Sequence, residues 1–294
     1  MNFINAERHR FGVEPICHVL EIAPSSYYAA VSRPTSARQV RDQELKQEIG
    51  RVHRDNFGVY GSEKVWRQLH REQVQVGRDR VGRLMHEMKL EGVRRGKRQI
   101  TTRPVEVGER PADLVERQFK APAPNRLWVA DLTYVSTWAG FIYTAFVVDV
   151  FSRAIVGWRV SASLRADLAL DALEMAIWSR RSQDLAGLVH HSDRGVQYLA
   201  IRYTERLAEA GAVTSVGSRG DSYDNALAES VHALYKTELI RRRGPWRSME
   251  EVELATARWV EWYNQRRLHG AIENLPPAEY EDRYWRRLQA PDAA

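Results

Sequence analysis

The chain is 294 residues long, with 44% hydrophobic residues and a formal net charge of +6. This length predicts about two domains, and the hydrophobic content can fill at least one sizeable core. A single cysteine, Cys17, excludes an intramolecular disulfide and a zinc ribbon, so His, Asp and Glu must supply any metal ligands. No apolar run reaches the ~18 residues of a membrane span, and the first residues, MNFINAERHRFG, do not form a signal peptide. We therefore expect a globular, cytoplasmic protein with no membrane partner.

Positive charge is concentrated in the first part of the chain. Residues 1–124 hold 23 Lys and Arg against 16 Asp and Glu, whereas residues 125–294 hold 21 against 22. A basic region attracts polyanions, because each phosphate that it neutralises releases counterions. The distribution favours nucleic acid as a partner of the first part, although many basic domains are merely solvated.

The first hundred residues are predicted to be helical. Within residues 1–40, the stretch PICHVLEIAPSSYYAAV has the pattern of helix, turn and helix, and its function is left open. Residues 41–100 contain three helical stretches, with Gly58, Gly61 and Gly77 as breaks between them. Three short helices joined by tight turns are typical of a helix-turn-helix DNA-binding domain. A structural bundle with a solvated basic face is the alternative.

Basic side chains of this predicted domain are the candidates for contact with DNA. Some lie in the third helical stretch and others in the basic run that follows it. The candidates are Arg78, Arg80, Arg83, Arg94, Arg95, Lys97 and Arg98. We expect them to contact mainly phosphates, which would make binding dependent on salt and weakly dependent on sequence.

The pattern changes after a predicted linker. Residues 101–124 contain four prolines and almost no apolar periodicity, so they cannot extend a helix or a central strand. Beyond them, three successive strands are followed by alternating helices and strands. The order βββαβαβα over residues 125–240 is that of a ribonuclease-H-like core, an α/β fold with a mixed five-stranded sheet and helices. Residues 241–294 are predicted to be a helical extension of the core.

Three carboxylates occupy the positions that carry chemistry in such a core. A ribonuclease-H-like core transfers phosphoryl groups with two divalent ions about 3.5–4 Å apart, held by carboxylate oxygens. The ligands fall on the first strand, at the end of the fourth strand and on the helix after the fifth. Asp131, Asp193 and Glu229 occupy those places. We predict that they are catalytic and bind two Mg²⁺ or Mn²⁺ ions.

The stretch GDSYDNALAES contains two further carboxylates, Asp221 and Asp224. Both lie where a helix would begin, and a negative side chain is favourable there for structural reasons, so we interpret them as capping or loop residues. One face of the predicted helix carries Asn225, Glu229, His232 and Lys236. Because Asn225 and Lys236 share the face of Glu229, they are candidates for contacts with DNA near the scissile bond.

Other polar residues are interpreted as structural. Asp149 ends an apolar strand, and we predict that it caps the turn into FSR rather than binding a metal. His190 and His191 precede Asp193, but a histidine at a strand end is more often a satisfied structural group.

The stretch TARWVEWYNQRRLHG combines aromatic and basic residues. Trp259, Trp262 and Tyr263 recur at helical spacing, which predicts packing in a core. The basic residues that follow are candidates for contacts with the DNA backbone. They are Arg266, Arg267 and His269.

Several of these stretches resemble the catalytic domain of transposases of the insertion-sequence-3 family, relatives of retroviral integrases. They are WVADLTYV, HSDRGVQY, GDSYDNALAESVHALYKTEL and WYNQRRLHG with PPAEY. Thirty-five residues separate Asp193 from Glu229, the spacing typical of this family. Upstream, FGVYGSEKVWRQLH and VGRDRVGRLMHEMKLEG are similar to the helix-turn-helix segment that precedes the family's catalytic core. Val196 replaces a usual serine, and RLHGAIENLPP replaces a more usual RLHSALG, but neither departure touches a carboxylate.

The resemblance implies a DNA transposase with an integrase catalytic core. The family's chemistry is metal-dependent cleavage that exposes a 3′-OH at the element's end, followed by attack of that 3′-OH on another phosphodiester. The implied partners are double-stranded DNA of the element ends and target, further copies of the chain on DNA, and an upstream-frame helix-turn-helix and coiled-coil protein or fusion. The chain has no long heptad run, so we expect that upstream piece to be absent from it. The expected location is the bacterial cytoplasm, in association with the nucleoid.

Two alternatives stay open on the sequence. The first is a ribonuclease-H-like nuclease that only hydrolyses, and the second is a non-catalytic DNA-binding regulatory product of the same element. The presence of all three carboxylates disfavours the second.

Overall fold

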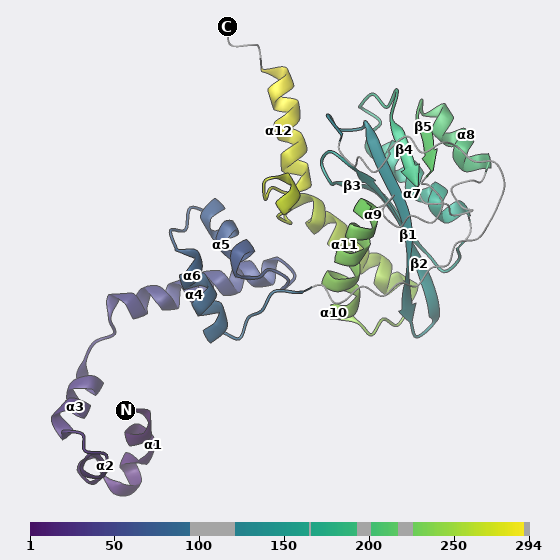
Figure 1. Ribbon diagram of the computed structural model, residues 1–294. Helices are drawn as coiled ribbons and strands as arrows, with labels where there is room; N and C mark the ends of the chain where they lie inside the picture. The colour runs from purple at the N-terminus through teal and green to yellow at the C-terminus, as the bar shows by residue number, and fades with distance from the viewer. Residues whose placement is uncertain (95–120, 165, 193–200, 217–225, 291–294) are drawn as a thin grey trace.

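The computed structural model describes residues 1–94, 121–164, 166–192, 201–216 and 226–290. Its helices and strands form a small N-terminal helical cluster, a three-helix domain and a sheet-containing core with helices on its faces (Figure 1). No helix within the described ranges combines the length and the apolar character that crossing a membrane requires.

The N-terminal cluster consists of α1 (Asn2–Phe11), α2 (Val13–Val19) and α3 (Pro24–Ser32). A small set of buried side chains holds it together: Ile4, Ile16, Cys17 and Tyr27. The helix, turn and helix predicted for this region are confirmed by α2 and α3. In Figure 1 the cluster lies away from the sheet and is connected to the rest through the long helix that follows.

The next three helices are α4 (Ala37–Asp55), α5 (Ser62–Arg71) and α6 (Arg78–Glu87), as predicted from the glycine breaks. α4 begins earlier than its apolar pattern suggested, because Ser36 and Gln39 form a reciprocal capping box at its start. The three helices pack around Leu45, Ile49, Val65, Leu69 and Leu84, all of which are fully buried.

The core contains a five-stranded sheet with the order β3-β2-β1-β4-β5. Its strands are β1 (Leu127–Thr137), β2 (Gly140–Asp149), β3 (Ile155–Ser161), β4 (Val189–Ser192) and β5 (Val213–Val216). β1, β2 and β3 form an antiparallel meander, whereas β4 is parallel to both β1 and β5. The sheet is therefore mixed and five-stranded, as predicted, and the elements follow the predicted order βββαβαβα along the chain.

Helices cover both faces of this sheet. One face packs against α7 (Ala166–Ser179) and α8 (Ile201–Glu209). The backbone of α7 approaches β3 so closely that a β-carbon on Gly157 would lie 2.1 Å from the carbonyl oxygen of Ala172. The other face packs against α9 (Ala226–Leu234) and α11 (Met249–Gln265). Because side chains alternate along a strand, Asp131 of β1 lies on the side of Val129 and Val135, which face α9 and α11.

After α9 the chain does not continue as a regular α-helix. It forms a π-helical segment, η2 (Tyr235–Ile240), and then the short α10 (Arg241–Arg243). α11 is followed by a 3₁₀ turn, η3 (Gly270–Ile272), and by α12 (Pro277–Gln289). A π-helical turn adds a residue to each turn, so it shifts the face on which every later side chain lies.

The three-helix domain is docked onto the C-terminal part of the core, a contact that the sequence did not predict. Phe57 stacks on Trp262 with ring centroids 4.8 Å apart, and the indole N–H of Trp262 donates to Asn56 at 3.0 Å. The backbone N–H of Leu268 donates to the hydroxyl of Tyr60 at 2.7 Å. These contacts are buried, so the junction is continuous with the hydrophobic core.

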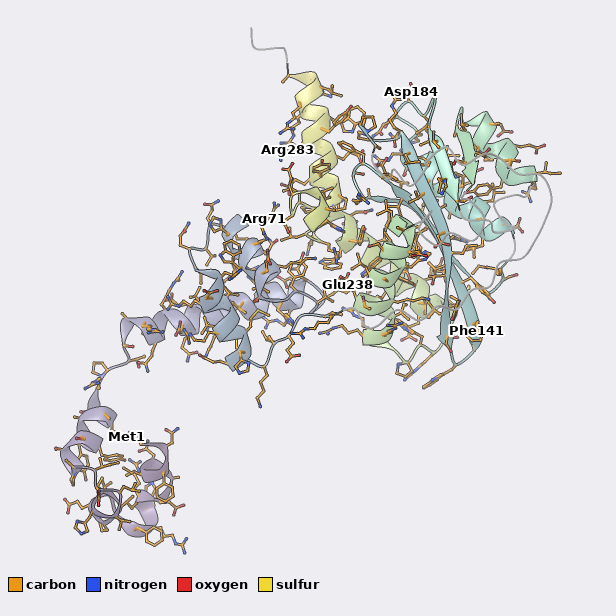
Figure 2. The ribbon with its side chains drawn as sticks, viewed as in Figure 1. Met1, Arg71, Phe141, Asp184, Glu238 and Arg283 are labelled. Atoms are coloured by element: carbon orange, nitrogen blue, oxygen red, sulfur yellow. The ribbon has the colours of Figure 1, made fainter. Side chains whose placement is uncertain are left out.

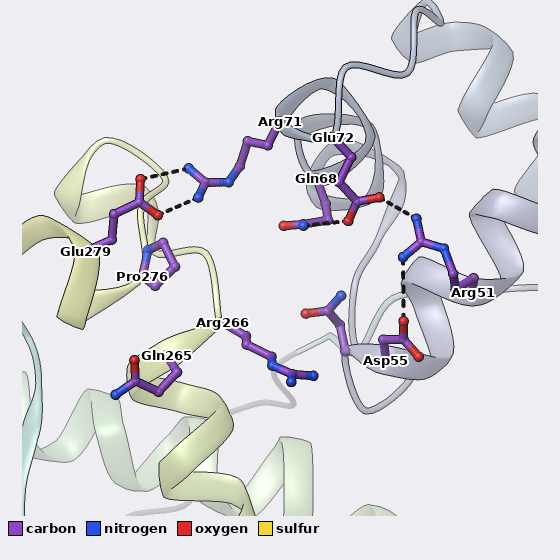
Figure 3. Close-up of a pocket in the computed structure, with 10 residues that line it drawn as sticks. Arg51, Asp55, Gln68, Arg71, Glu72, Gln265, Arg266, Pro276 and Glu279 are labelled. Carbon is purple, nitrogen blue, oxygen red and sulfur yellow. Dashed lines mark hydrogen bonds and ion pairs between the residues drawn. The ribbon is translucent and has the colours of Figure 1, made fainter.

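Beside these buried contacts lies a polar cleft of about 310 Å³ (Figure 3). Arg71 of α5 forms an ion pair with Glu279 of α12 across it. Arg51 of α4 is paired with both Glu72 and Asp55 on the domain side. The charges of this cleft are largely compensated by one another.

Candidate active site

The contact between β1 and α9 brings Asp131 close to the helix that carries Glu229. Asp131 lies on β1, and Glu229 lies in the first turn of α9, which packs against that strand. His232, one turn after Glu229, has its Nδ1 3.2 Å from Oδ2 of Asp131. Glu229 precedes His232 by three residues and therefore lies on the same side of α9.

The carboxylate of Asp131 is partly exposed and accepts few hydrogen bonds from the protein. Its side chain is 15% exposed, and Oδ1 accepts from the backbone N–H of Leu132 at 2.7 Å. Nδ1 of His232 is the ring nitrogen that faces Oδ2 of Asp131. The other ring nitrogen, Nε2, is buried and makes no hydrogen bond to a described residue. The sequence placed His232 on this helix face but gave it no role.

Asp193, the third predicted ligand, lies outside the described residues. β4 ends at Ser192, and Ser192 pairs with Ala130, the residue before Asp131. Asp193 is the residue that follows Ser192 in the sequence. Among the residues that the structure describes, no group of three His, Cys, Asp or Glu side chains is placed to hold a metal ion.

Other residues singled out in the sequence also lie outside the described ranges. They are Arg95, Lys97, Arg98, Val196, Asp221, Asp224 and Asn225. Nothing in the structure tests the DNA contacts predicted for the first three and for Asn225, or the capping role predicted for the two aspartates.

Lys236 lies close to Asp131 on the same side of the sheet. Its ammonium group is 4.6 Å from the centre of the Tyr134 ring. The pKa of Lys236 is lowered, first by burial and then by repulsion from Arg241, and attraction to Asp131 only partly offsets this. A cation thus lies near Asp131.

Asp149 has the structural role that the sequence predicted. It is fully buried at the end of β2, and its carboxylate accepts from the backbone N–H groups of Asn125 at 2.7 Å and Ser152 at 2.9 Å. Burial raises the pKa of Asp149, and these hydrogen bonds oppose that shift. Asp149 therefore caps the turn after β2.

The two histidines of β4 are also satisfied structural groups. His190 Nε2 lies 3.0 Å from the hydroxyl of Tyr203, and His191 Nδ1 lies 2.9 Å from the hydroxyl of Ser215. Both are buried, and burial lowers the pKa of His190 to about 3. We therefore expect a neutral imidazole at His190 near neutral pH.

The arginines of α6 differ in their availability to DNA. Arg78 is exposed, and Arg94, beyond the helix, is exposed as well. Arg80 and Arg83 both form ion pairs with Asp42 of α4, at 2.8 Å each. Hydrogen bonds from these two arginines hold the pKa of Asp42 below its usual value. In this conformation Arg80 and Arg83 brace α6 against α4, which leaves Arg78 and Arg94 as the more accessible pair.

The structure places two residues of the predicted backbone-contacting group in the interior. Arg267 is 5% exposed and donates through Nε and Nη2 to Glu238, with its shortest contact at 2.6 Å. Burial works to lower the pKa of Arg267, but attraction to Glu238 outweighs it and raises that pKa. His269 is 7% exposed, and its ring packs edge-on against Tyr263. Neither side chain is accessible to a phosphate in this conformation.

Arg266 alone of this group reaches the surface. Its side chain is exposed and extends toward the polar cleft beside the three-helix domain (Figure 3). The packing predicted for the aromatic residues of α11 is confirmed, because Trp259, Trp262 and Tyr263 are all buried.

The mixed five-stranded sheet with helices on both faces, preceded by a three-helix domain, has the architecture of an integrase-type polynucleotidyl transferase. Comparison with known families agrees. An integrase core domain model matches residues 121–222, another integrase core domain model matches residues 210–277, and an HTH-like domain model matches residues 40–98.

The chain is also similar along its whole length to curated transposases. It is 55% identical over 277 residues to the putative transposase for insertion sequence element IS986/IS6110 of Mycobacterium tuberculosis, with 93% of this chain and 100% of the relative covered. It is 51% identical over 302 residues to the transposase for insertion sequence element IS629 of Shigella sonnei, covering 100% and 99%. The chain belongs to the insertion-sequence-3 family of DNA transposases.

Among solved structures, the catalytic core domain of HTLV-2 integrase in complex with magnesium is similar at 17% identity and a TM-score of 0.43. The match covers 54% of this chain and 98% of that domain.

Proposed function

We propose that Asp131, Asp193 and Glu229 together bind two Mg²⁺ ions and catalyse 3′-end cleavage and strand transfer of an insertion sequence. The contact between Asp131 of β1 and His232 of α9, the helix that also carries Glu229, supports this most. The pairing of Ser192, the residue before Asp193, with Ala130, the residue before Asp131, supports including Asp193.

The described residues fit such ions. A hard divalent cation prefers carboxylate oxygens, and Asp131 offers two that remain partly exposed. Its orientation is held by the backbone N–H of Leu132 and by His232, so the carboxylate does not need to reorganise when a ligand binds. When bound, the ions would activate the attacking oxygen and stabilise the leaving oxygen.

The other residues of the site would position the DNA. Lys236, beside Asp131, supplies positive charge where the scissile phosphate would lie. Arg78 and Arg94 are exposed cations on the three-helix domain and would contact the backbone further away. Arg266 would contribute at the junction between that domain and the core.

We further propose that the enzyme acts as an oligomer on its element ends and that a helix-turn-helix and coiled-coil protein, or a fusion to it, improves recognition of those ends. The support is the family resemblance. Measuring the affinity for end sequence and for random sequence, with and without that piece, tests the second proposal. Equal ratios would contradict it.

The catalytic assignment is tested with Mg²⁺-dependent cleavage of a labelled duplex that carries the element's end. We expect Asp131→Asn, Asp193→Asn and Glu229→Gln each to abolish nicking and strand transfer while DNA binding persists, because an amide keeps the shape but loses the charge that holds a divalent ion. Asp221→Asn and Asp224→Asn are the matched controls and should stay active, since asparagine can still cap a helix. Full activity of Glu229→Gln beside an inactive Asp224→Asn would refute the third ligand.

A further inference from the structure

A β-hairpin with exposed aromatic rings extends beyond the active site. β1 pairs with β4 only as far as Ala130, so among the described residues Asp131–Thr137 has β2 as its one neighbouring strand. The side chains of Tyr134, Trp138 and Phe141 on this hairpin are 45%, 71% and 60% exposed, and we call them the aromatic ribbon. Phe141 projects from the end of the hairpin, away from the helices (Figure 2).

The aromatic ribbon is held in place although its rings are exposed. The backbone N–H of Trp138 donates to the carbonyl of Trp246 at 3.0 Å, which fixes the hairpin tip to the segment before α11. Trp246 is itself buried, and its indole N–H donates to Ile240 at 2.9 Å. Tyr134 and Phe141 meet edge to face, 5.7 Å apart. An ordered backbone that presents exposed rings is suited to binding, because little conformational entropy is lost when a ligand arrives.

Cations lie beside these rings. Lys236 is 4.6 Å from the centre of Tyr134, and the guanidinium of Arg247 is 5.8 Å from the centre of Trp138. Among the described residues neither cation is within ion-pairing distance of a carboxylate. Aromatic rings interleaved with cations suit a single strand of nucleic acid, whose bases stack on the rings while its phosphates meet the charges.

The aromatic ribbon lies close to Asp131 along the chain. Tyr134 follows Asp131 by three residues, so the two side chains leave opposite faces of β1, and Lys236 is near both of them. We propose that the aromatic ribbon stacks the unpaired bases of the DNA strand next to the scissile phosphate. This inference rests on the proposed function only for the position of that phosphate. The binding itself requires no cleavage.

The test uses the full chain and the double variant Trp138→Ala/Phe141→Ala. The control is Trp178→Ala, because Trp178 is an equally exposed tryptophan, 67% exposed, with Arg181 4.4 Å from its ring. Trp178 lies on α7, which packs on the opposite face of the sheet from α9. All these side chains are exposed, so the thermal unfolding midpoints of the parent and both variants should agree. Equal midpoints would show that a loss of binding does not come from a loss of fold.

Binding is measured by fluorescence anisotropy in EDTA, with a single-stranded oligonucleotide and with the fully paired duplex. We expect the double variant to lose about tenfold or more in affinity for the single strand, as loss of base stacking predicts. Its affinity for the duplex and both affinities of Trp178→Ala should match the parent. In addition, 5-iodouracil placed beside the scissile position should photocrosslink to Trp138 or Phe141.

Unchanged affinity of the double variant for the single strand would overturn the inference. Sedimentation gives a second outcome that would overturn it. If the parent were a dimer and the double variant a monomer with unchanged affinity for the single strand, the aromatic ribbon would be a protein interface. Because no step requires cleavage, an inactive enzyme would contradict the proposed function without affecting this result.

Discussion

Asp131 and Asp149 lie on neighbouring strands, and their carboxylates differ in burial and in the hydrogen bonds that they accept from the protein. Asp149 is fully buried, and both of its oxygens accept from backbone N–H groups. Asp131 is partly exposed, and its contacts with described residues are one backbone N–H and His232. A structural carboxylate has its lone pairs filled by the protein, whereas Asp131 retains acceptor capacity for something else. The difference identifies which of two similar aspartates is available to a ligand.

The cations Arg267 and Lys236 also differ in whether the protein provides a paired counter-charge. Arg267 is buried and fixed by Glu238, and this ion pair supports the junction with the three-helix domain. Lys236 is half-buried and forms no ion pair with a described carboxylate. If this comparison is correct, substitutions of the paired groups should cost stability, and substitutions of the under-paired groups should cost activity.

The largest expected loss of stability follows Glu238→Gln. This change leaves Arg267 buried without its counter-charge, and breaking one side of a buried ion pair typically costs about 3–5 kcal/mol. The control is Glu279→Gln, which breaks the exposed pair with Arg71 and should cost less than about 1 kcal/mol. Urea unfolding of both variants measures the difference. Equal losses would contradict the structural role of the buried pair.

Acid should destabilise the protein through its buried histidines. Burial lowers the pKa of His190 from 6.5 to about 3, and it lowers the pKa of His269 well below 6.5. The unfolded chain therefore binds protons that the folded chain does not, so this stability is present above pH 6.5 and is lost as the pH falls. At about pH 5 the loss from His190 is about 2 kcal/mol.

The measurement is urea unfolding of the parent and of His190→Asn at neutral pH and at about pH 5. The variant should lose less stability on acidification than the parent, because the buried imidazole of His190 is gone. An identical pH dependence in both proteins would show that His190 is not buried as a neutral group.

The smallest expected changes in the free energy of unfolding come from substitutions of Asp149 and Asp131, which compare the two aspartates directly. Asp149→Asn should destabilise the fold by about 1–3 kcal/mol, because an amide offers one acceptor to two buried N–H groups. Asp131→Asn should change the free energy of unfolding by no more than about 0.5 kcal/mol, since its carboxylate supports little of the fold. Chemical denaturation distinguishes the two. A larger loss for Asp131→Asn would reverse our interpretation of both residues.

The sequence was sufficient for the features that depend on local periodicity. Alternation along β1 placed Asp131 on one side of a strand, and helical spacing placed Glu229 and His232 on one face of α9. The order of strands and helices was enough to predict the sheet, because ribonuclease-H-like topology follows from that order.

The sequence was not sufficient where a partner is distant or the helical period changes. Arg267 is buried because Glu238, 29 residues earlier, meets it. Glu238 lies in the π-helical segment η2, where a period of 3.6 residues no longer predicts which side chains face inward. Asn56 and Trp262 meet at the junction although they are 206 positions apart in the sequence, and no local sequence pattern predicts such a contact.

The central claim is that Asp131 is a direct ligand of the catalytic metal ions, and metal rescue of a cysteine variant tests it most directly. A thiolate binds the softer Mn²⁺ better than Mg²⁺, whereas a carboxylate accepts both. DNA cleavage by the parent, Asp131→Cys and Asp131→Asn is measured in each metal. We predict that the parent cleaves in both, that Asp131→Cys cleaves in Mn²⁺ but not in Mg²⁺, and that Asp131→Asn cleaves in neither. Equal activity of Asp131→Cys in the two metals, or activity of Asp131→Asn in either, would contradict direct ligation.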